Sequence, residues 1–380
     1  MKKYKVQIIA GAVVLALLAV GLTVVIGKNR KNKRTYVNFD VIGKTIEFGE
    51  TSEVHYLPSG QGVFRYTRDG AEIIDRKGKS KVTVSYSMNK PYGATCGNAA
   101  AIGEFGGKSL VIVDNKGNVT PITTAYPIVM VKVASQGVTA VLMNNGNEDF
   151  IELYASDGTS IASMNTLVAT SGMPVDISLS NDGTKLVTAY VSFKEEHVQT
   201  QLSFYNFGSV GGNYVDGLVA VELYRDEMIA DVEFVNNDTI VAFADTGFRI
   251  YDMEEIADLK KEVKISDPIH SVACSPAHVG VVTEHKTKDG NYVLRVYDLE
   301  GKTVDEKTMT EAYEHFQLEG SDVILFNEKE IYIYRIGGRD KIRVEMRKNL
   351  SYVAAMDGVN EFVFVGETYF ERIRLVGEKR

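Results

Sequence analysis

One motif, an alternating apolar run that turns back on itself, recurs along this chain and restricts the fold more than any other feature. Its clearest copy is PVDISLSNDGTKLVTAY at residues 174–190, where Asn-Asp-Gly supplies the positive φ angles of a tight hairpin turn. Three more copies also begin at a proline, namely Pro91, Pro127 and Pro268, and four others share the pattern without it. A solitary hairpin would say little, but eight copies dictate an architecture.

The spacing of the copies predicts a β-propeller. Their starts lie roughly 37 to 56 residues apart, which brackets the 40–45 residues of a four-stranded blade. A second hairpin follows most copies, as in EIIDRKGKSKVTVSYS and LRVYDLEGKTVDEKT, and it supplies the third and fourth strands. We therefore predict an all-β, eight-bladed propeller. Seven blades are the alternative, because the repeat containing ATCGNAAAIGEFGG is weakly patterned.

The two ends of the chain predict how the ring closes. The last repeat, LSYVAAMDGVNEFVFVGETYFERIRLVGEKR, supplies three strands and then stops. We expect a strand within residues 43–50 to complete this blade by pairing near residues 370–376. A closure of this kind would leave only short, protected edges.

The N-terminal segment predicts a membrane anchor. Residues 6–27 carry no charge, and about 20 apolar residues span the roughly 30 Å hydrocarbon layer of a bilayer. A cleaved signal peptide and a buried core helix are the alternatives, but a signal peptide has a shorter apolar core. We expect residues 1–27 to be a cytoplasmic tip and transmembrane helix in contact with membrane lipid. Residues 28–40 would then be a basic linker, and residues 41–380 the propeller domain.

Charge informs both orientation and partners. The basic flanks of the anchor nearly balance, yet long domains are translocated largely regardless of charge. We expect a single-pass cell-membrane protein with an extracytoplasmic propeller. The net charge is −8, and the first 34 residues hold eight basic and no acidic residues, which leaves about −16 on the remainder. Such an acidic body is a poor nucleic-acid binder.

No catalytic or metal-binding motif is found. His55, His270 and His315 lie in innermost rows, where each is expected to be one polar residue facing a wet channel, although a converging cluster is conceivable. We predict no catalytic residue, no metal and no cofactor. Cys96 and Cys274 occupy the same repeat position on opposite blades, so we expect two buried, unpaired thiols.

Blade four contains the candidate contact site. It inserts VSFKEEHVQTQ between its second and third strands and NFGSVGGNYVDGLVA between its third and fourth. Additions to a regular scaffold often carry binding, so Glu195, Glu196 and His197 are proposed as a partner contact, with a solvated hairpin end as the alternative. In blade five, MEEIADLKKEVK is expected to form a short helix with Ile256 and Leu259 facing inward.

The repeat motifs resemble known propellers. DISLSNDGTKLVTAY and RVYDLEGKTV resemble hairpins of the WD40-like and lactonase-like class, although the chain has no Trp and so lacks the Trp-Asp ending of true WD repeats. The whole arrangement resembles membrane-anchored propellers of unknown function from Gram-positive anaerobic bacteria, a resemblance that implies no catalytic residues.

These features predict a function in binding. We expect a non-enzymatic interaction or sensing platform at the cell envelope for a protein, peptide or glycan. The enzymatic alternative is a hydrolase or lyase acting on a cell-surface polymer or lactone. Such an enzyme should show carboxylates or histidines converging on the channel. A third alternative is a cytoplasmic-facing scaffold for a membrane complex.

Overall fold

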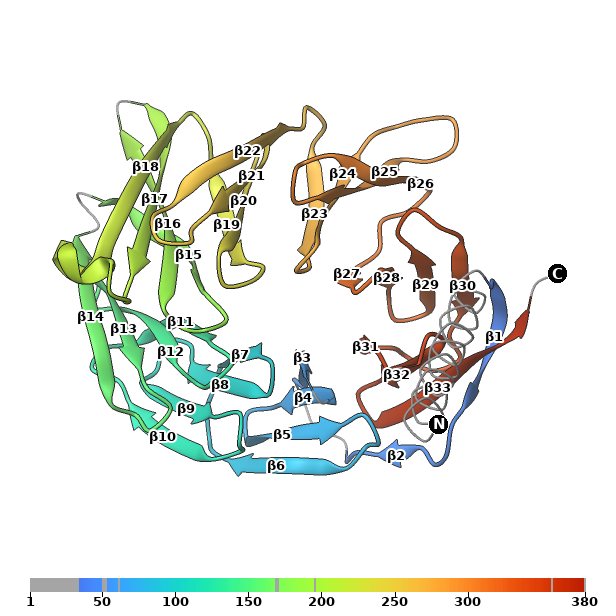
Figure 1. The fold of residues 1–380 in the computed structure, drawn as a ribbon. Coiled ribbons are helices and arrows are strands. Elements are labelled where there is room, and N and C mark those ends of the chain that lie inside the picture. The colour runs from blue at the N-terminus through green and yellow to red at the C-terminus, as the bar shows by residue number, and fades with distance from the viewer. Residues whose placement is uncertain are drawn as a thin grey trace, which may run out of the picture.

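Eight antiparallel sheets form a ring in the computed structural model, with the first strand of each sheet nearest the centre (Figure 1). The structure describes residues 34–49, 53–60, 62–167, 171–194, 196–356 and 358–378. The eight-bladed prediction is therefore confirmed, and the seven-bladed alternative is wrong.

Blades one to four each use consecutive strands, ordered from the centre outward. Blade one contains β3 (His55–Ser59), β4 (Gly62–Tyr66), β5 (Gly70–Asp75) and β6 (Ser80–Ser85). Blade two contains β7 (Pro91–Cys96), β8 (Ala99–Glu104), β9 (Ser109–Val113) and β10 (Val119–Thr123). Blade three contains β11 (Ile128–Val133), β12 (Thr139–Asn144), β13 (Glu148–Tyr154) and β14 (Ser160–Leu167). Blade four contains β15 (Met173–Leu179), β16 (Lys185–Lys194), β17 (His197–Asn206) and β18 (Leu218–Arg225), with short 3₁₀ turns η1 (Gly211–Asn213) and η2 (Val215–Gly217) before β18.

Blades five to seven repeat this order, and blade eight combines both ends of the chain. Blade five contains β19 (Ile229–Phe234), β20 (Thr239–Ala244), β21 (Gly247–Asp252) and β22 (Asp258–Lys264). Blade six contains β23 (Ile269–Cys274), β24 (His278–Glu284), β25 (Tyr292–Asp298) and β26 (Thr303–Met309). Blade seven contains β27 (His315–Glu319), β28 (Asp322–Phe326), β29 (Glu330–Arg335) and β30 (Asp340–Glu345). Blade eight contains β31 (Tyr352–Ala355), β32 (Glu361–Val365) and β33 (Tyr369–Glu378), completed by β1 (Tyr36–Val41) and β2 (Ile46–Glu47).

Burial along the strands explains the sequence pattern. Neighbouring blades cover both faces of the second strands, so these strands are nearly continuous apolar runs, and every residue of β28 is buried. The outer strand β10 instead alternates between exposed and half-buried residues. Blade two has a weak pattern because its second strand begins with three alanines, and Ala99, Ala100 and Ala101 are all fully buried. Small side chains allow its neighbours to pack closely there.

The ring closes as expected, partly at the predicted place and partly through a second strand that lies further toward the N-terminus. The predicted range contributes only β2, whose Ile46 pairs with Phe370. Most of the closure comes from β1, which lies N-terminal to that range and runs antiparallel to β33 from Tyr36↔Glu378 to Val41↔Ile373. β1 begins inside the segment expected to be a linker. It does so because Tyr36 is buried in the apolar cluster between blades seven and eight.

The helix predicted in blade five is wrong. Residues 258–264 form β22, and Ile256 and Leu259 are 44% and 40% exposed. Pairing of β22 with β21 satisfies the backbone of this segment, and tertiary pairing thus overrides the helical pattern.

The predicted membrane anchor lies outside the described residues. Within the part of the chain that the structure describes, no helix is long and apolar enough to cross a membrane.

Candidate functional site

Blade four has a long, fully paired hairpin formed by β16 and β17. β16 and β17 have ten residues each, whereas the second strands of the other blades have five to seven. The two strands stay paired to the end, where the backbone of Lys194 pairs with that of His197. Glu196 occupies the turn with a positive φ of 67° and is exposed, while Glu195 lies outside the described residues. The predicted insertion is therefore an ordered extension of the sheet.

The predicted His197 has a partner that the sequence did not indicate. Its Nδ1 lies 2.5 Å from Oδ1 of Asp226, the residue that follows β18 on the way to blade five. Both side chains are exposed. This contact joins the hairpin to the connection between blades four and five and places one carboxylate beside the imidazole.

Two exposed apolar side chains lie on neighbouring strands of blade four, Phe193 on β16 and Met173 at the start of β15. Phe193 is 82% exposed and Met173 is 63% exposed. Met173 pairs with Val191, and Phe193 shares the face of Val191 because alternate residues of a strand point the same way. We call Met173, Phe193, Glu196, His197 and Asp226 the blade-four tip. Phe193 and Met173 present an aromatic and a Met side chain, both enriched at protein interfaces, on one face of blade four, whereas His197 pairs with Lys194 and points to the other face.

A second group of side chains meets in the central channel, from blades three, four and five. Lys132 lies 3.4 Å from Oδ1 of Asp176, and the other oxygen of Asp176 accepts a 2.9 Å bond from the backbone N–H of Val232. Asp231 and Glu233 lie on either side of Val232 and therefore point to the opposite face of β19. With Lys132 they line a cavity of about 340 Å³.

The carboxyl groups of this channel group have raised pKa values. Burial raises the pKa of Asp231 to about 7, and the nearby carboxylates of Asp176 and Glu233 act in the same direction. Burial also raises the pKa of Glu233, against the attraction of Lys132. Burial alone would lower the pKa of Lys132, but Asp176 reverses the direction and leaves it raised. A carboxyl group that titrates near neutrality can serve as a general acid or base.

The channel group could not be predicted from the sequence. Asp176, Asp231 and Glu233 can each be placed on an innermost strand from alternation, but their proximity depends on how neighbouring blades meet. The structure brings together the converging carboxylates that were expected of an enzyme. The channel group is therefore the site at which the enzymatic alternative can be tested.

The three histidines of the innermost rows do not converge. His55 and His315 stack on Tyr66 and Phe326 of their own blades, with ring centroids 4.9 and 4.3 Å apart. His270 contacts Tyr292 edge to face at 5.2 Å, again within its own blade. Among the residues that the structure describes, no group of three or more His, Cys, Asp or Glu side chains could hold a metal ion.

The two thiols are unpaired, as predicted, but only half-buried. Cys96 ends β7 of blade two and Cys274 ends β23 of blade six, so the predicted repeat position is confirmed. Cys96 lines the channel cavity, which explains why its burial is incomplete. The thiol of Cys96 donates to Oδ1 of Asn181 at 3.4 Å. Burial raises the pKa of both thiols, and neither has the low pKa of a reactive cysteine.

Comparisons with known proteins agree with this geometry at the level of fold. The model of a family of unknown function, DUF5711, matches residues 32–375. The crystal structure of BamB from Moraxella catarrhalis is similar with a TM-score of 0.55 and 10% identity, covering 90% of this chain and all of that one. A crystal structure of a eukaryotic initiation factor is similar with a TM-score of 0.56 and 12% identity, covering 91% of this chain and 89% of that one. No curated protein matches the chain significantly.

Proposed function

The chain belongs to the DUF5711 family of unknown function, and from that premise we propose that it is a membrane-tethered, non-enzymatic interaction or sensing platform at the cell envelope. The observation that carries this proposal is the blade-four tip. It holds an 82% exposed Phe193 on a hairpin whose two strands stay paired as far as Lys194 and His197. Exposed aromatic anchors with a polar border are typical of binding hot spots.

The charge of the protein defines the expected partner. The tip includes the carboxyl groups of Glu196 and Asp226 as well as Phe193 and Met173, and the body has a charge of about −16. A partner surface with an apolar recess and a basic border would complement it. Protein and peptide partners fit this description, and so does a glycan that stacks on the aromatic ring.

Cross-linking in native membranes tests the platform. We expect one set of partners to be recovered with the full chain and lost with Phe193→Ser or His197→Ala. Ile161→Ser is the matched control, since Ile161 is 50% exposed on the outer strand of blade three and away from the tip. Recovery that is insensitive to the tip variants but lost with Ile161→Ser would refute the assignment.

The tether and the orientation are tested separately. We propose that residues 6–27 span the membrane and that the propeller is extracytoplasmic. Protease added to intact, wall-stripped cells should then digest the propeller. Full protection until lysis would instead favour a cytoplasmic-facing scaffold.

The channel group supports a second candidate, a hydrolase or lyase that acts on a cell-surface polymer or lactone. Asp231, whose pKa is raised to about 7, would be its general acid or base, and Asp176 lies beside it. Turnover of a lactone or a cell-wall polymer that disappears in Asp231→Asn, and survives in Phe193→Ser, would favour this enzyme over the platform.

A further inference from the structure

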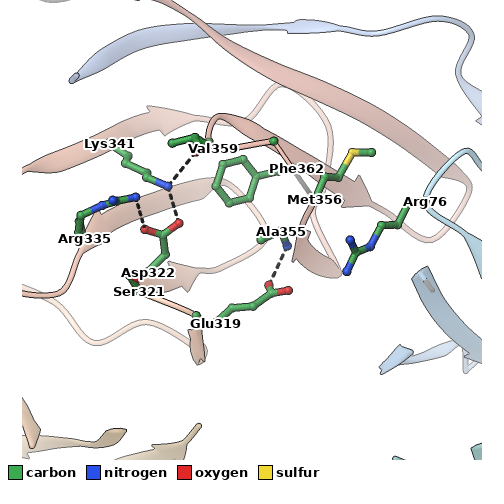
Figure 2. A pocket seen from close by; sticks show the side chains of 12 residues that line it. Arg76, Glu319, Ser321, Asp322, Arg335, Lys341, Ala355, Met356, Val359 and Phe362 are labelled. Carbon is green, nitrogen blue, oxygen red and sulfur yellow. Dashed lines mark hydrogen bonds and ion pairs between the residues drawn. The ribbon is translucent and has the colours of Figure 1, made fainter. Parts of the chain in front are cut away.

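A pocket of about 330 Å³ lies between blades seven and eight, where a turn of blade one also reaches it (Figure 2). Three cationic side chains line it, Arg76, Arg335 and Lys341, against the two carboxyl groups of Glu319 and Asp322. The pocket is therefore more positive than negative within a body that carries about −16. Such a local reversal of sign attracts small anions.

Asp322 organises the cations on one wall of the pocket. Its Oδ2 pairs with Nζ of Lys341, whose side chain is only 3% exposed, and the same Nζ donates to the carbonyl of Val359 at 2.9 Å. Its Oδ1 is 3.4 Å from Nη2 of Arg335. Figure 2 shows this chain of contacts along one side of the pocket. Lys341 is thus held by two partners, whereas Nε of Arg335 is buried and has no hydrogen-bond partner among the described residues.

Arg335 departs from the repeat of this protein. In blades one, two and six an aspartate, Asp75, Asp114 or Asp298, stands where the third strand enters its turn, and its Oδ1 accepts two backbone N–H bonds across that turn. Blade seven places Arg335 there instead, and its partner position on β28 is Asp322. Blade seven therefore lacks the carboxylate that stabilises this turn in the other three blades, and has in its place a guanidinium that lines the pocket. Departures from a local rule of this kind concentrate at functional sites.

The other walls favour an organic anion over an inorganic one. Phe362 is buried beside Lys341, and Met356 and Ala355 add apolar surface. Glu319 accepts a 2.7 Å bond from the backbone N–H of Ala355, and burial raises the pKa of its carboxyl group. The cavity volume is at the lower end of the range for small-molecule sites.

We propose that this pocket binds a small carboxylate whose apolar group packs against Phe362 and Met356 and whose oxygens accept from Arg335 and Arg76. A guanidinium presents paired donors that match a carboxylate. This site lies between other blades than the tip, so its occupancy does not depend on a partner there.

Calorimetric titration of the full chain tests the site, with N-acetyl-leucine as the carboxylate and N-acetyl-leucinamide as its uncharged match. We expect saturable binding of the acid and none of the amide. Arg335→Gln should weaken binding by about tenfold or more, and Arg335→Lys by less, since it keeps the charge but loses the planar donor pair. The control Arg68→Gln removes the same charge from an exposed pair with Glu53 and should leave binding unchanged.

Three outcomes would overturn the proposal. They are equal binding of acid and amide, no saturable binding of the acid, and tighter binding of inorganic phosphate than of N-acetyl-leucine. If Arg335→Gln fails to fold, Arg76→Gln on blade one tests the same requirement for charge, and unchanged affinity there would contradict the site.

Discussion

Blades four and eight both depart from the regular four-stranded blade, in opposite directions. Blade four has all its strands in one chain segment and adds length to two of them. Blade eight has too few strands in its own segment and takes β1 and β2 from residues near the other end of the described chain. The added length in blade four exposes Phe193, whereas the borrowed strand in blade eight buries Tyr36.

This difference separates the residues that stabilise the fold from the residues that are proposed to contact a partner. Removing side chains from the blade-four tip uncovers no apolar surface, because those side chains are already in water. Removing β1 uncovers an entire edge of β33 and the apolar cluster beneath it. We therefore expect the two blades to respond to mutation in different assays.

The largest effect is expected from truncation of blade eight. Deleting residues 1–49 removes β1 and β2, including buried Tyr36 and the ring of Phe39 that packs 5.2 Å from Phe364. The lost burial and backbone bonds should lower the free energy of unfolding by about 4 kcal/mol or more. Deleting only residues 1–35 is the control and should leave it unchanged. Equal denaturation midpoints for the two truncations would contradict the closure.

A smaller loss of stability is expected from a substitution on β15, the innermost strand of blade four. Asp176→Ala leaves the N–H of buried Val232 without its acceptor and removes the partner of Lys132. We expect a loss of about 2 kcal/mol in chemical denaturation. Glu196→Ala, at the outer end of the same blade, is the control and should have no measurable effect. A loss of similar size in both variants would mean that the tip also stabilises the fold.

The pH dependence of stability should reveal the raised pKa of Asp231 in the channel group. The folded-state pKa of Asp231 is about 7, above its ordinary value near 4, so between these values the folded state binds more protons than the unfolded state. Stability is therefore expected to fall as pH rises from about 4 to 7. Asp231→Asn mimics the protonated group and should gain about 1 kcal/mol at pH 7 with a shallower slope. Parallel pH profiles for the two proteins would show that Asp231 is ionised throughout this range.

The smallest effect on stability is expected at the blade-four tip. Phe193→Ser and Met173→Ser change side chains that are already largely exposed, so the free energy of unfolding should shift by less than about 0.5 kcal/mol. Partner recovery from native membranes should nonetheless fall sharply. A large drop in melting temperature would show that Phe193 is part of the core, and the comparison between the two blades would fail.

Parts of the candidate site were readable from the sequence and others were not. Glu196 and His197 could be found because an insertion interrupts a regular repeat. Asp226 could not, because it lies 29 positions from His197 and meets it only through the pairing of β17 with β18. Phe193 was inside the quoted insertion, but nothing in the sequence distinguished it from a buried aromatic.

The sequence by itself determined the number of blades, the inner-strand position of both cysteines and the borrowing of a strand by blade eight. These follow from local rules, since alternation and turn residues act within about ten positions and the repeat carries them around the ring. Tertiary structure decided which strand closes the ring, that residues 258–264 pair as a strand, and that Asp176, Asp231 and Glu233 come close together. Those outcomes depend on contacts between distant segments, where burial and charge at a meeting point outweigh the preference of any single segment.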